Sequence, residues 1–260
     1  MTRIDELFAR TRAENRAALV GYLPVGFPDV KTSIDAMLAM VDAGVDLVEV
    51  GVPYTDPGMD GPVIQVAVDT ALRAGVRVAD VFDAVQAVAA KAPAVVMGYW
   101  NPIEKMTPAV FAQRLKDAGG SGAITPDLIP EEAGPWLDAA REHDLDPVFL
   151  VAPSSTDERI AVVGKANRGF IYAASTMGVT GTRDTVSNRA EELVARTRAL
   201  SNLPIGVGLG VSNGDQAAEV AAYADAVIVG SAFVRALDEG GLDAVRRLAE
   251  DLARGVRQRA

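Results

Sequence analysis

The chain has 260 residues, 49% of them hydrophobic, so it is long enough to bury a sizeable core in one large domain. Its formal net charge of -10 argues against a nucleic-acid partner, but backbone N–H groups can still hold an anionic small ligand. The absence of cysteine excludes disulfides, thiolate nucleophiles and sulfur metal ligands, and the apolar runs are too short to span a bilayer. The charged N-terminus is unlike a secretory signal, so we predict a soluble cytoplasmic protein.

Strand-length apolar segments recur along the chain, and most of them are hydrophobic at every position. Such continuous patterns are typical of parallel strands that are covered on both faces. The eight predicted strands are Ala18–Leu23, Leu47–Val52, Ala94–Tyr99, Gly122–Thr125, Pro147–Val151, Gly169–Ala173, Ile205–Leu209 and Ala226–Gly230.

Helical patterns lie between these strands, and several of them end at glycine, which is a common C-terminal stop. The predicted helices are 2–14, Ser33–Ala43, Val63–Ala74, Val78–Ala90, Pro108–Ala118, Glu131–His143, Asp157–Ala166, Ser187–Leu200, Asp215–Tyr223, Phe233–Leu237 and Leu242–Val256.

Regular alternation of strands and helices predicts parallel strands joined by right-handed crossovers. Eight such units close into an α/β fold, a (β/α)8 TIM barrel, here with an extra N-terminal helix. We expect residues 1–260 to form a single barrel domain, because no linker or low-complexity tract interrupts them. An open doubly wound sheet is the alternative, although no Gly-x-Gly-x-x-Gly follows the first strand.

The segment Val48–Pro62 places one carboxylate inside an apolar strand and two more in the Gly/Pro-rich loop that follows. A buried, ionised Glu49 is costly unless it is paired or neutral, and burial raises the pKa of a carboxyl toward neutrality. Glu49 is therefore a candidate acid–base group, and a structural glutamate bonded to backbone or tyrosine is the alternative. Asp60 precedes a Gly-Pro pair and fits a helix cap or a catalyst equally well, whereas Asp56 fits a turn or surface contact.

Two strand ends are rich in glycine: Gly206–Ser212 at the seventh strand, and Gly230-Ser231 at the eighth, just before a short helix. Glycine lets a phosphate approach the backbone, and the helix aims its N–H groups at it. Barrels of this type commonly bind phosphate at this place. We therefore predict a phosphate site, with tight turns alone as the alternative.

The segment 175–184 after the sixth strand is long and glycine-flanked, which fits a lid over a ligand as well as a plain loop. Aromatic residues are scarce, yet several fall at or near strand ends and indicate a flat apolar substrate. They are Tyr22, Tyr54, Tyr99, Trp100 and Tyr172.

The positions of the lysines, the histidine and the acidic residues limit the reaction mechanisms that are possible. The five lysines all fall in predicted helices, helix ends or outer loops, which argues against a Schiff base. The only histidine, His143, is expected on the surface, so there is no histidine cluster for zinc, and no set of acids clearly forms a magnesium cage. Proton transfer by carboxylates on a phosphorylated substrate remains, as isomerisation, retro-aldol cleavage or elimination.

Four motifs carry a resemblance to a known family. They are the E-x-G-x-P-[FY]-[ST]-D-P-x-x-D-G-P segment at Glu49–Pro62, the G-V-T-G loop at Gly178–Gly181, the G-x-G at Gly208–Gly210 and the G-S at Gly230-Ser231. With these motifs in the same order over nearly its whole length, the chain resembles the alpha subunit of tryptophan synthase.

The resemblance implies retro-aldol cleavage of indole-3-glycerol phosphate to indole and glyceraldehyde 3-phosphate in L-tryptophan biosynthesis. Glu49 is then the general acid–base, which protonates indole C3 and takes the proton of the adjacent hydroxyl. Asp60 hydrogen-bonds the indole N–H and stabilises the positive charge that develops there, and Thr180 holds Asp60 when the loop closes. The other implied binding residues are Gly181, Gly208, Gly210, Gly230 and Ser231 around the phosphate, and Tyr22, Ile64, Tyr99 and Tyr172 along the pocket.

The resemblance also implies a partner, the tryptophan synthase beta subunit, in an alpha2beta2 complex. Pyridoxal phosphate belongs to that partner, and no cofactor or metal is expected in this chain. Asp56 and the loops near Pro53, Asn101 and Asp127 fall where the family meets the partner.

Two rival functions stand beside this one. A phosphosugar isomerase barrel of amino-acid biosynthesis would place an aspartate pair at the first and fifth strand ends. Gly21–Pro24 and Val151–Pro153 carry no carboxylate there. The other rival is a non-catalytic barrel that only activates a partner subunit.

Overall fold

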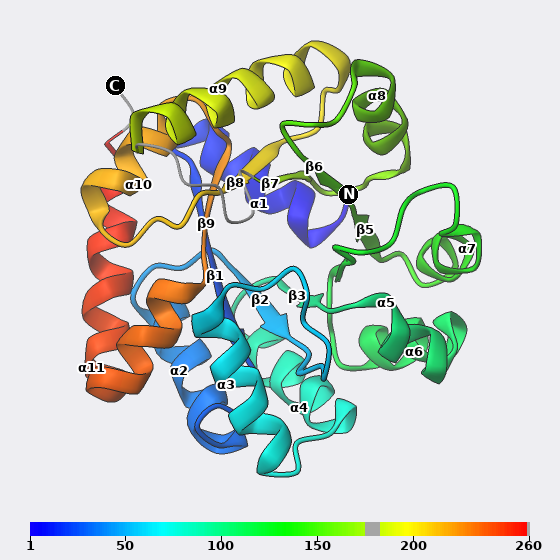
Figure 1. Cartoon of the computed structure of the whole chain (residues 1–260), viewed down its shortest axis with the longest axis vertical. Coiled ribbons are helices and arrows are strands. Elements are labelled where there is room, and N and C mark those ends of the chain that lie inside the picture. Colours follow the sequence, from blue (N-terminus) through cyan, green and yellow to red (C-terminus); the bar gives the residue numbers. More distant parts are fainter. Residues whose placement is uncertain (175–182, 259–260) are drawn as a thin grey trace.

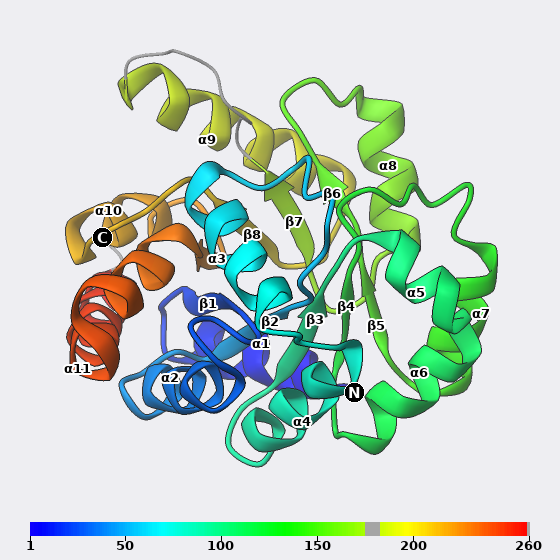
Figure 2. The same cartoon turned by 60° about the horizontal axis from the view of Figure 1, so that its bottom comes forward.

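The computed structural model describes residues 1–174 and 183–258. In that part of the chain, all strands pair in parallel in one nine-stranded sheet of order β5-β4-β3-β2-β1-β9-β8-β7-β6, which helices surround (Figures 1 and 2). The strands are β1 Ala18–Pro24, β2 Leu47–Gly51, β3 Ala94–Met97, β4 Gly122–Ile124, β5 Asp146–Val148, β6 Leu150–Val151, β7 Ile171–Ala174, β8 Ile205–Gly208 and β9 Ala226–Val229.

The helices follow the strands in the expected alternation, after an N-terminal helix that precedes β1. They are α1 Arg3–Ala13, α2 Val30–Asp42, α3 Pro62–Arg73, α4 Val78–Ala89, α5 Trp100–Met106, α6 Pro108–Asp117, α7 Gly134–Glu142, α8 Asp157–Ala166, α9 Arg183–Leu200, α10 Gly214–Ala221 and α11 Ser231–Gly255.

Each predicted strand is present, but the fifth is divided at Phe149. Its first part, β5, pairs with β4, and its second part, β6, pairs with β7. The two ends of the strand order are therefore adjacent pieces of one extended segment, and the sheet closes on itself. The predicted TIM barrel with an extra N-terminal helix is confirmed, and the open doubly wound alternative is wrong.

Asn167, the residue that ends α8, bridges this division. Its side-chain Oδ1 accepts the Phe149 N–H at 2.7 Å, and its Nδ2 donates to the carbonyls of Phe149 and Phe170 at 3.2 Å each. Asn167 is only 5% exposed, so these bonds satisfy backbone groups that water does not reach. One buried amide thus joins the closing strand to the start of β7.

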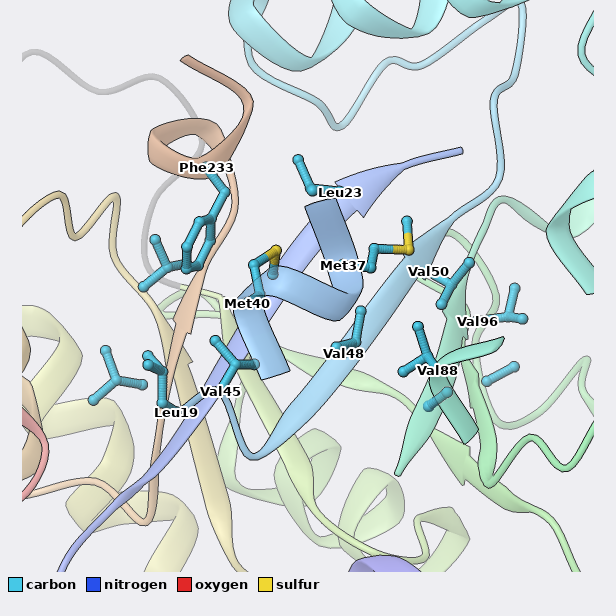
Figure 3. Close-up of a cluster of buried hydrophobic side chains, with 14 of the residues drawn as sticks. Leu19, Leu23, Met37, Met40, Val45, Val48, Val50, Val88, Val96 and Phe233 are labelled. Carbon is cyan, nitrogen blue, oxygen red and sulfur yellow. The ribbon is translucent and has the colours of Figure 1, made fainter. Parts of the chain in front are cut away.

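Apolar side chains fill two layers. Inside the barrel, the strands pack against α1, which covers the N-terminal end through Ile4, Leu7 and Phe8 (Figure 1). Outside the barrel, the strands pack against the surrounding helices. Figure 3 shows Met37 and Met40 of α2 directed toward β1 and β2 in this outer layer. Along β2, Leu47 therefore faces inward while its neighbour Val48 faces outward.

Helix prediction was less complete than strand prediction. α5 was missed: it follows β3 directly, and Thr107, with φ of 70°, separates it from α6. The two predicted C-terminal helices are joined as α11, with non-helical backbone at Gly241, where φ is 61°. Among the helices of residues 1–174 and 183–258, none is long and apolar enough to cross a membrane.

We expect Asn167→Ala to lower the free energy of unfolding by about 3 kcal/mol, because it leaves buried backbone groups at the barrel closure without partners. Chemical denaturation measures the change, and Asn202→Ala, at an exposed asparagine, is the matched control. Equal stability of the two variants would show that the closure does not depend on the amide.

Candidate active site

Glu49 lies inside the barrel, in the layer above the apolar floor. It is two residues after the inward-facing Leu47, so the strand periodicity puts both side chains on the same face. In the sheet register it is beside Tyr22 of β1 and Val95 of β3. The residue is 2% exposed. The sequence thus places a carboxyl among apolar strands, near the carboxyl ends where such barrels bind their ligands.

The Glu49 carboxyl is desolvated without compensation. Its Oε1 is buried and has no hydrogen-bond partner among the described residues. Burial raises the pKa of Glu49 from 4.5 to about 8. A glutamate kept only for structure would be expected to pair, so this geometry favours the acid–base interpretation.

Asp60 lies in the loop between β2 and α3, next to the strand that carries Glu49. The helix cap interpretation is wrong, because Gly61 is the N-cap residue of α3 and no side chain caps that helix. Instead, the Tyr99 hydroxyl donates to Asp60 Oδ2 at 3.2 Å and accepts the Met59 N–H at 2.8 Å. Burial raises the pKa of Asp60, and the hydrogen bond from Tyr99 acts in the opposite direction.

Tyr22 and Tyr172 each lie over a glycine at the end of a strand. A Cβ at Gly51 would come within 2.6 Å of the Tyr22 hydroxyl, and a Cβ at Gly208 would come equally close to that of Tyr172. Burial, together with the charges of Glu49 and Asp60, raises the pKa of both phenols well above its ordinary value. Both tyrosines therefore stay neutral in the mouth beside the two acids.

The predicted phosphate region is at the ends of β8 and β9, which pair with each other. A Cβ at Gly230 would lie 3.3 Å from Tyr22 Cδ1 and 3.6 Å from Ile64 Cδ1, so Ile64 of α3 reaches the same wall. Ser231 is the first residue of α11. Gly210 has a φ of +66°, which a residue with a side chain rarely adopts, and no atom lies within 4 Å of where its Cβ would be.

The structure thus brings most predicted site residues to one end of the barrel. Thr180 and Gly181, together with most of the predicted lid, lie outside the described residues. Trp100 is not part of this group, because it packs against the outer hydrophobic layer. Tyr54, the other predicted aromatic residue, packs on Tyr99, and the two ring centroids are 5.3 Å apart.

A cavity of about 700 Å³ lies over the ends of β6 and β7 and against α9, and neither Glu49 nor Asp60 is among the residues that line it. Leu150 and Ala174 form part of its floor, and Met59 connects it to the loop of Asp60. Sequence reasoning missed Met59 and Leu150. Adjacency to Asp60 was the available signal for Met59, and an apolar strand position gave none for Leu150.

The lysines and the histidine do not lie on strand ends. Each of the five lysines is in a helix or, for Lys91, two residues after one. His143 ends α7 on the side from which the chain enters β5, at the opposite end of the barrel. Within the described residues, no group of three or more His, Cys, Asp or Glu side chains is arranged to hold a metal ion.

Glu49→Gln is expected to raise the free energy of unfolding at pH 8 by about 3–5 kcal/mol. The folded protein keeps the Glu49 proton up to pH about 8 and the unfolded chain releases it near 4.5, so wild-type stability falls as pH rises between these values. The glutamine variant lacks this loss. Denaturant unfolding from pH 5 to 8 measures the difference, and Glu104→Gln, at an exposed site, is the control. Parallel wild-type and glutamine-variant curves would contradict the raised pKa.

Comparison with known proteins identifies the family. A family model described as tryptophan synthase alpha chain matches residues 8–258. The tryptophan synthase alpha chain of Mycobacterium intracellulare is 60% identical over 260 residues, which is 100% of this chain and 96% of the relative. That of Nocardia farcinica is 61% identical over 257 residues, 98% of this chain and 96% of the relative.

Solved structures agree with the sequence comparison. A structure of Mycobacterium tuberculosis tryptophan synthase superposes with a TM-score of 0.94 at 57% identity and covers 98% of both chains. The tryptophan synthase subunit alpha of Legionella pneumophila str. Paris gives a TM-score of 0.91 at 30% identity, again over 98% of both chains. The chain therefore belongs to the tryptophan synthase alpha chain family.

Proposed function

We propose that this chain cleaves indole-3-glycerol phosphate into indole and glyceraldehyde 3-phosphate, with Glu49 as the general acid–base. One observation carries the proposal: a carboxyl that is 2% exposed, with its pKa raised to about 8, lies at the mouth of the barrel. At neutral pH such a group is mostly protonated, so it can give a proton to carbon and then accept one from oxygen.

The proposed reaction needs no metal and no lysine. Glu49 donates its proton to C3 of the indole ring, and the ring nitrogen takes up the resulting positive charge. The Glu49 carboxylate then removes the proton of the hydroxyl on the carbon attached to C3. That carbon becomes the aldehyde of glyceraldehyde 3-phosphate as its bond to C3 breaks, and the bonding electrons return to the ring and neutralise the nitrogen.

We assign to Asp60 the stabilisation of the positive charge that develops on the indole ring. Its carboxylate, in a partly buried loop beside β2, would accept a hydrogen bond from the indole N–H and stabilise the cation. The proposed pocket wall is a set of apolar and aromatic side chains at the mouth, of which Tyr22, Ile64 and Tyr172 lie against glycines. It consists of Tyr22, Ile64, Tyr99 and Tyr172.

The phosphate is assigned to the paired ends of β8 and β9. Gly208 and Gly210 lie at the end of β8, where Gly210 is exposed, and Gly230 and Ser231 begin α11, whose N-terminal N–H groups favour an anion. Gly181 is proposed to complete the phosphate site, and Thr180 to hold Asp60; both assignments rest on the sequence resemblance. The position of this site across the barrel mouth from Glu49 suits a substrate with an apolar ring and an anionic tail.

We further propose that the chain is a single domain that works in the cytoplasm with a tryptophan synthase beta subunit in an alpha2beta2 complex. The partner would hold pyridoxal phosphate and receive indole. The proposed contact surface consists of the loops that follow β2, β3 and β4, which are adjacent strands. Its residues are Pro53, the exposed Asp56 and Asn101, and Asp127.

The isomerase alternative is less well supported. The carboxylates at the mouth come from β2 and its loop, whereas β1 ends at Leu23-Pro24 and β6 at Val151. A non-catalytic barrel that only activates a partner would have the same fold. It differs from the proposed enzyme in that it would not need Glu49 for proton transfer.

The test is release of free indole from indole-3-glycerol phosphate by the purified chain. We expect Glu49→Gln to reduce the rate by about 10²–10⁴, which is the usual contribution of general acid–base catalysis. Asp60→Asn is expected to reduce it by roughly 10²-fold or more through loss of charge stabilisation.

Asp69→Asn, on the exposed face of α3, is the matched control and should keep wild-type activity. Unchanged indole release by Glu49→Gln would remove Glu49 from the mechanism. No indole release by the wild type, alone or with a beta subunit, would favour the purely activating role.

A further inference from the structure

The Tyr99 hydroxyl makes two hydrogen bonds whose directions are fixed by each other. It accepts the Met59 N–H at 2.8 Å, and it lies 3.2 Å from Asp60 Oδ2. A phenol has one proton and can accept through its lone pairs. Because the bond from Met59 uses a lone pair, the single proton is left for Asp60. An ionised carboxylate is the form of Asp60 that best accepts it.

Tyr99 is itself held on both sides. It is 7% exposed, it is the N-cap residue of α5, and its ring packs on Tyr54. The next residue, Trp100, donates its backbone N–H to Asp127 Oδ1 at 2.9 Å. The loop after β4 thus fixes the start of α5, and α5 fixes the direction in which the phenol enters the mouth.

We propose that Tyr99 is a positioning residue, whose hydroxyl keeps Asp60 ionised and turned toward the ring nitrogen of the substrate. This inference rests on the proposed function. It gives Tyr99 a role beyond lining the pocket, because it acts on the reaction through a second residue. Among the described residues, it is the side chain seen to hydrogen-bond to the Asp60 carboxylate.

The surroundings of Asp60 favour its protonation, so the hydrogen bond from Tyr99 matters for keeping it ionised. Glu49 comes from β2, Tyr22 from β1 and Tyr172 from β7, and both phenols interact electrostatically with Asp60. Both phenols have a raised pKa and are neutral over the working range of pH. Burial favours the protonated form of Asp60, and the Tyr99 hydrogen bond opposes it. Without the hydroxyl, Asp60 should therefore take up a proton at a higher pH.

The two acids then control opposite sides of the pH profile. Activity requires ionised Asp60, so it is lost on the acidic side, and it requires protonated Glu49, so it is lost as pH rises through about 8. Asp127 interacts electrostatically with Tyr99 and lies outside this pair. A change confined to the acidic side would consequently identify Asp60 as the group affected.

The experiment compares Tyr99→Phe with wild type in kcat/KM for indole release from pH 5 to 9. We expect the acidic limb of the variant to lie about one pH unit above that of the wild type, because loss of one hydrogen bond to the carboxylate is worth about a tenfold change in its protonation equilibrium. The basic limb should not move. Tyr54→Phe is the matched control, since it removes a hydroxyl from the neighbouring ring and should leave the acidic limb in place.

A second measurement does not depend on activity. Carboxyl ¹³C NMR of the ligand-free proteins, with Asp60→Asn used for assignment, should show a higher pKa for Asp60 in Tyr99→Phe. If the wild type releases indole and the variant changes only KM, with both limbs and the NMR titration unmoved, the positioning role is wrong and the proposed function stands. If the wild type releases no indole, the proposed function fails, and the NMR titration alone decides whether Tyr99 sets the charge of Asp60.

Discussion

The desolvation of a single carboxyl is the constraint on which the proposed chemistry of this barrel depends. Glu49 lies above a layer of apolar inward-facing side chains, and its Oε1 has no hydrogen-bond partner in the described part of the chain. In water the proton would leave near pH 4.5; here burial holds it to about pH 8. An acid that is protonated at neutral pH but still able to ionise follows from this burial alone, with no charged neighbour needed to produce it.

The shape of the barrel mouth depends on glycines at the strand ends, because they leave space that a side chain would fill. Gly51 and Gly208 leave room for the hydroxyl ends of Tyr22 and Tyr172, and Gly230 leaves room where Tyr22 and Ile64 meet. Alanine at Gly51 or Gly208 would need the space that a phenol occupies. Gly210, beyond the end of β8, differs from them, because it is exposed and no atom lies within 4 Å of where its Cβ would be. In the proposed site, glycines covered by phenols therefore shape the ring pocket, and an uncovered glycine leaves room for the anion.

Periodicity and composition in the sequence were sufficient to predict the strands and the barrel, and they singled out Glu49 as a buried carboxyl. For Asp60 they left a helix cap and a catalyst equally open. They were insufficient wherever a long-range contact decides the structure. The division of the fifth strand depends on Asn167, which is 18 residues from Phe149, and the partner of Asp60 is Tyr99, which is 39 residues away. α5 was missed for a similar reason: its first N–H is bonded by Asp127, 27 residues further along. Local sequence patterns do not show which residues far apart in the chain will be in contact.

Burial of an acid is not enough to make a site, as Asp146 demonstrates. This residue is fully buried at the start of β5, and burial raises its pKa to about 6, against the opposing effects of Thr2 and Arg168. Arg168 Nε lies 3.4 Å away, however, and Asp146 is at the N-terminal end of its strand. Within the part of the chain that the structure describes, Glu49 has no ion-pair partner, and it lies toward the carboxyl ends of the strands, near their glycines. Position along the strand, more than the perturbed pKa, therefore separates the candidate catalyst from a carboxyl of the barrel floor.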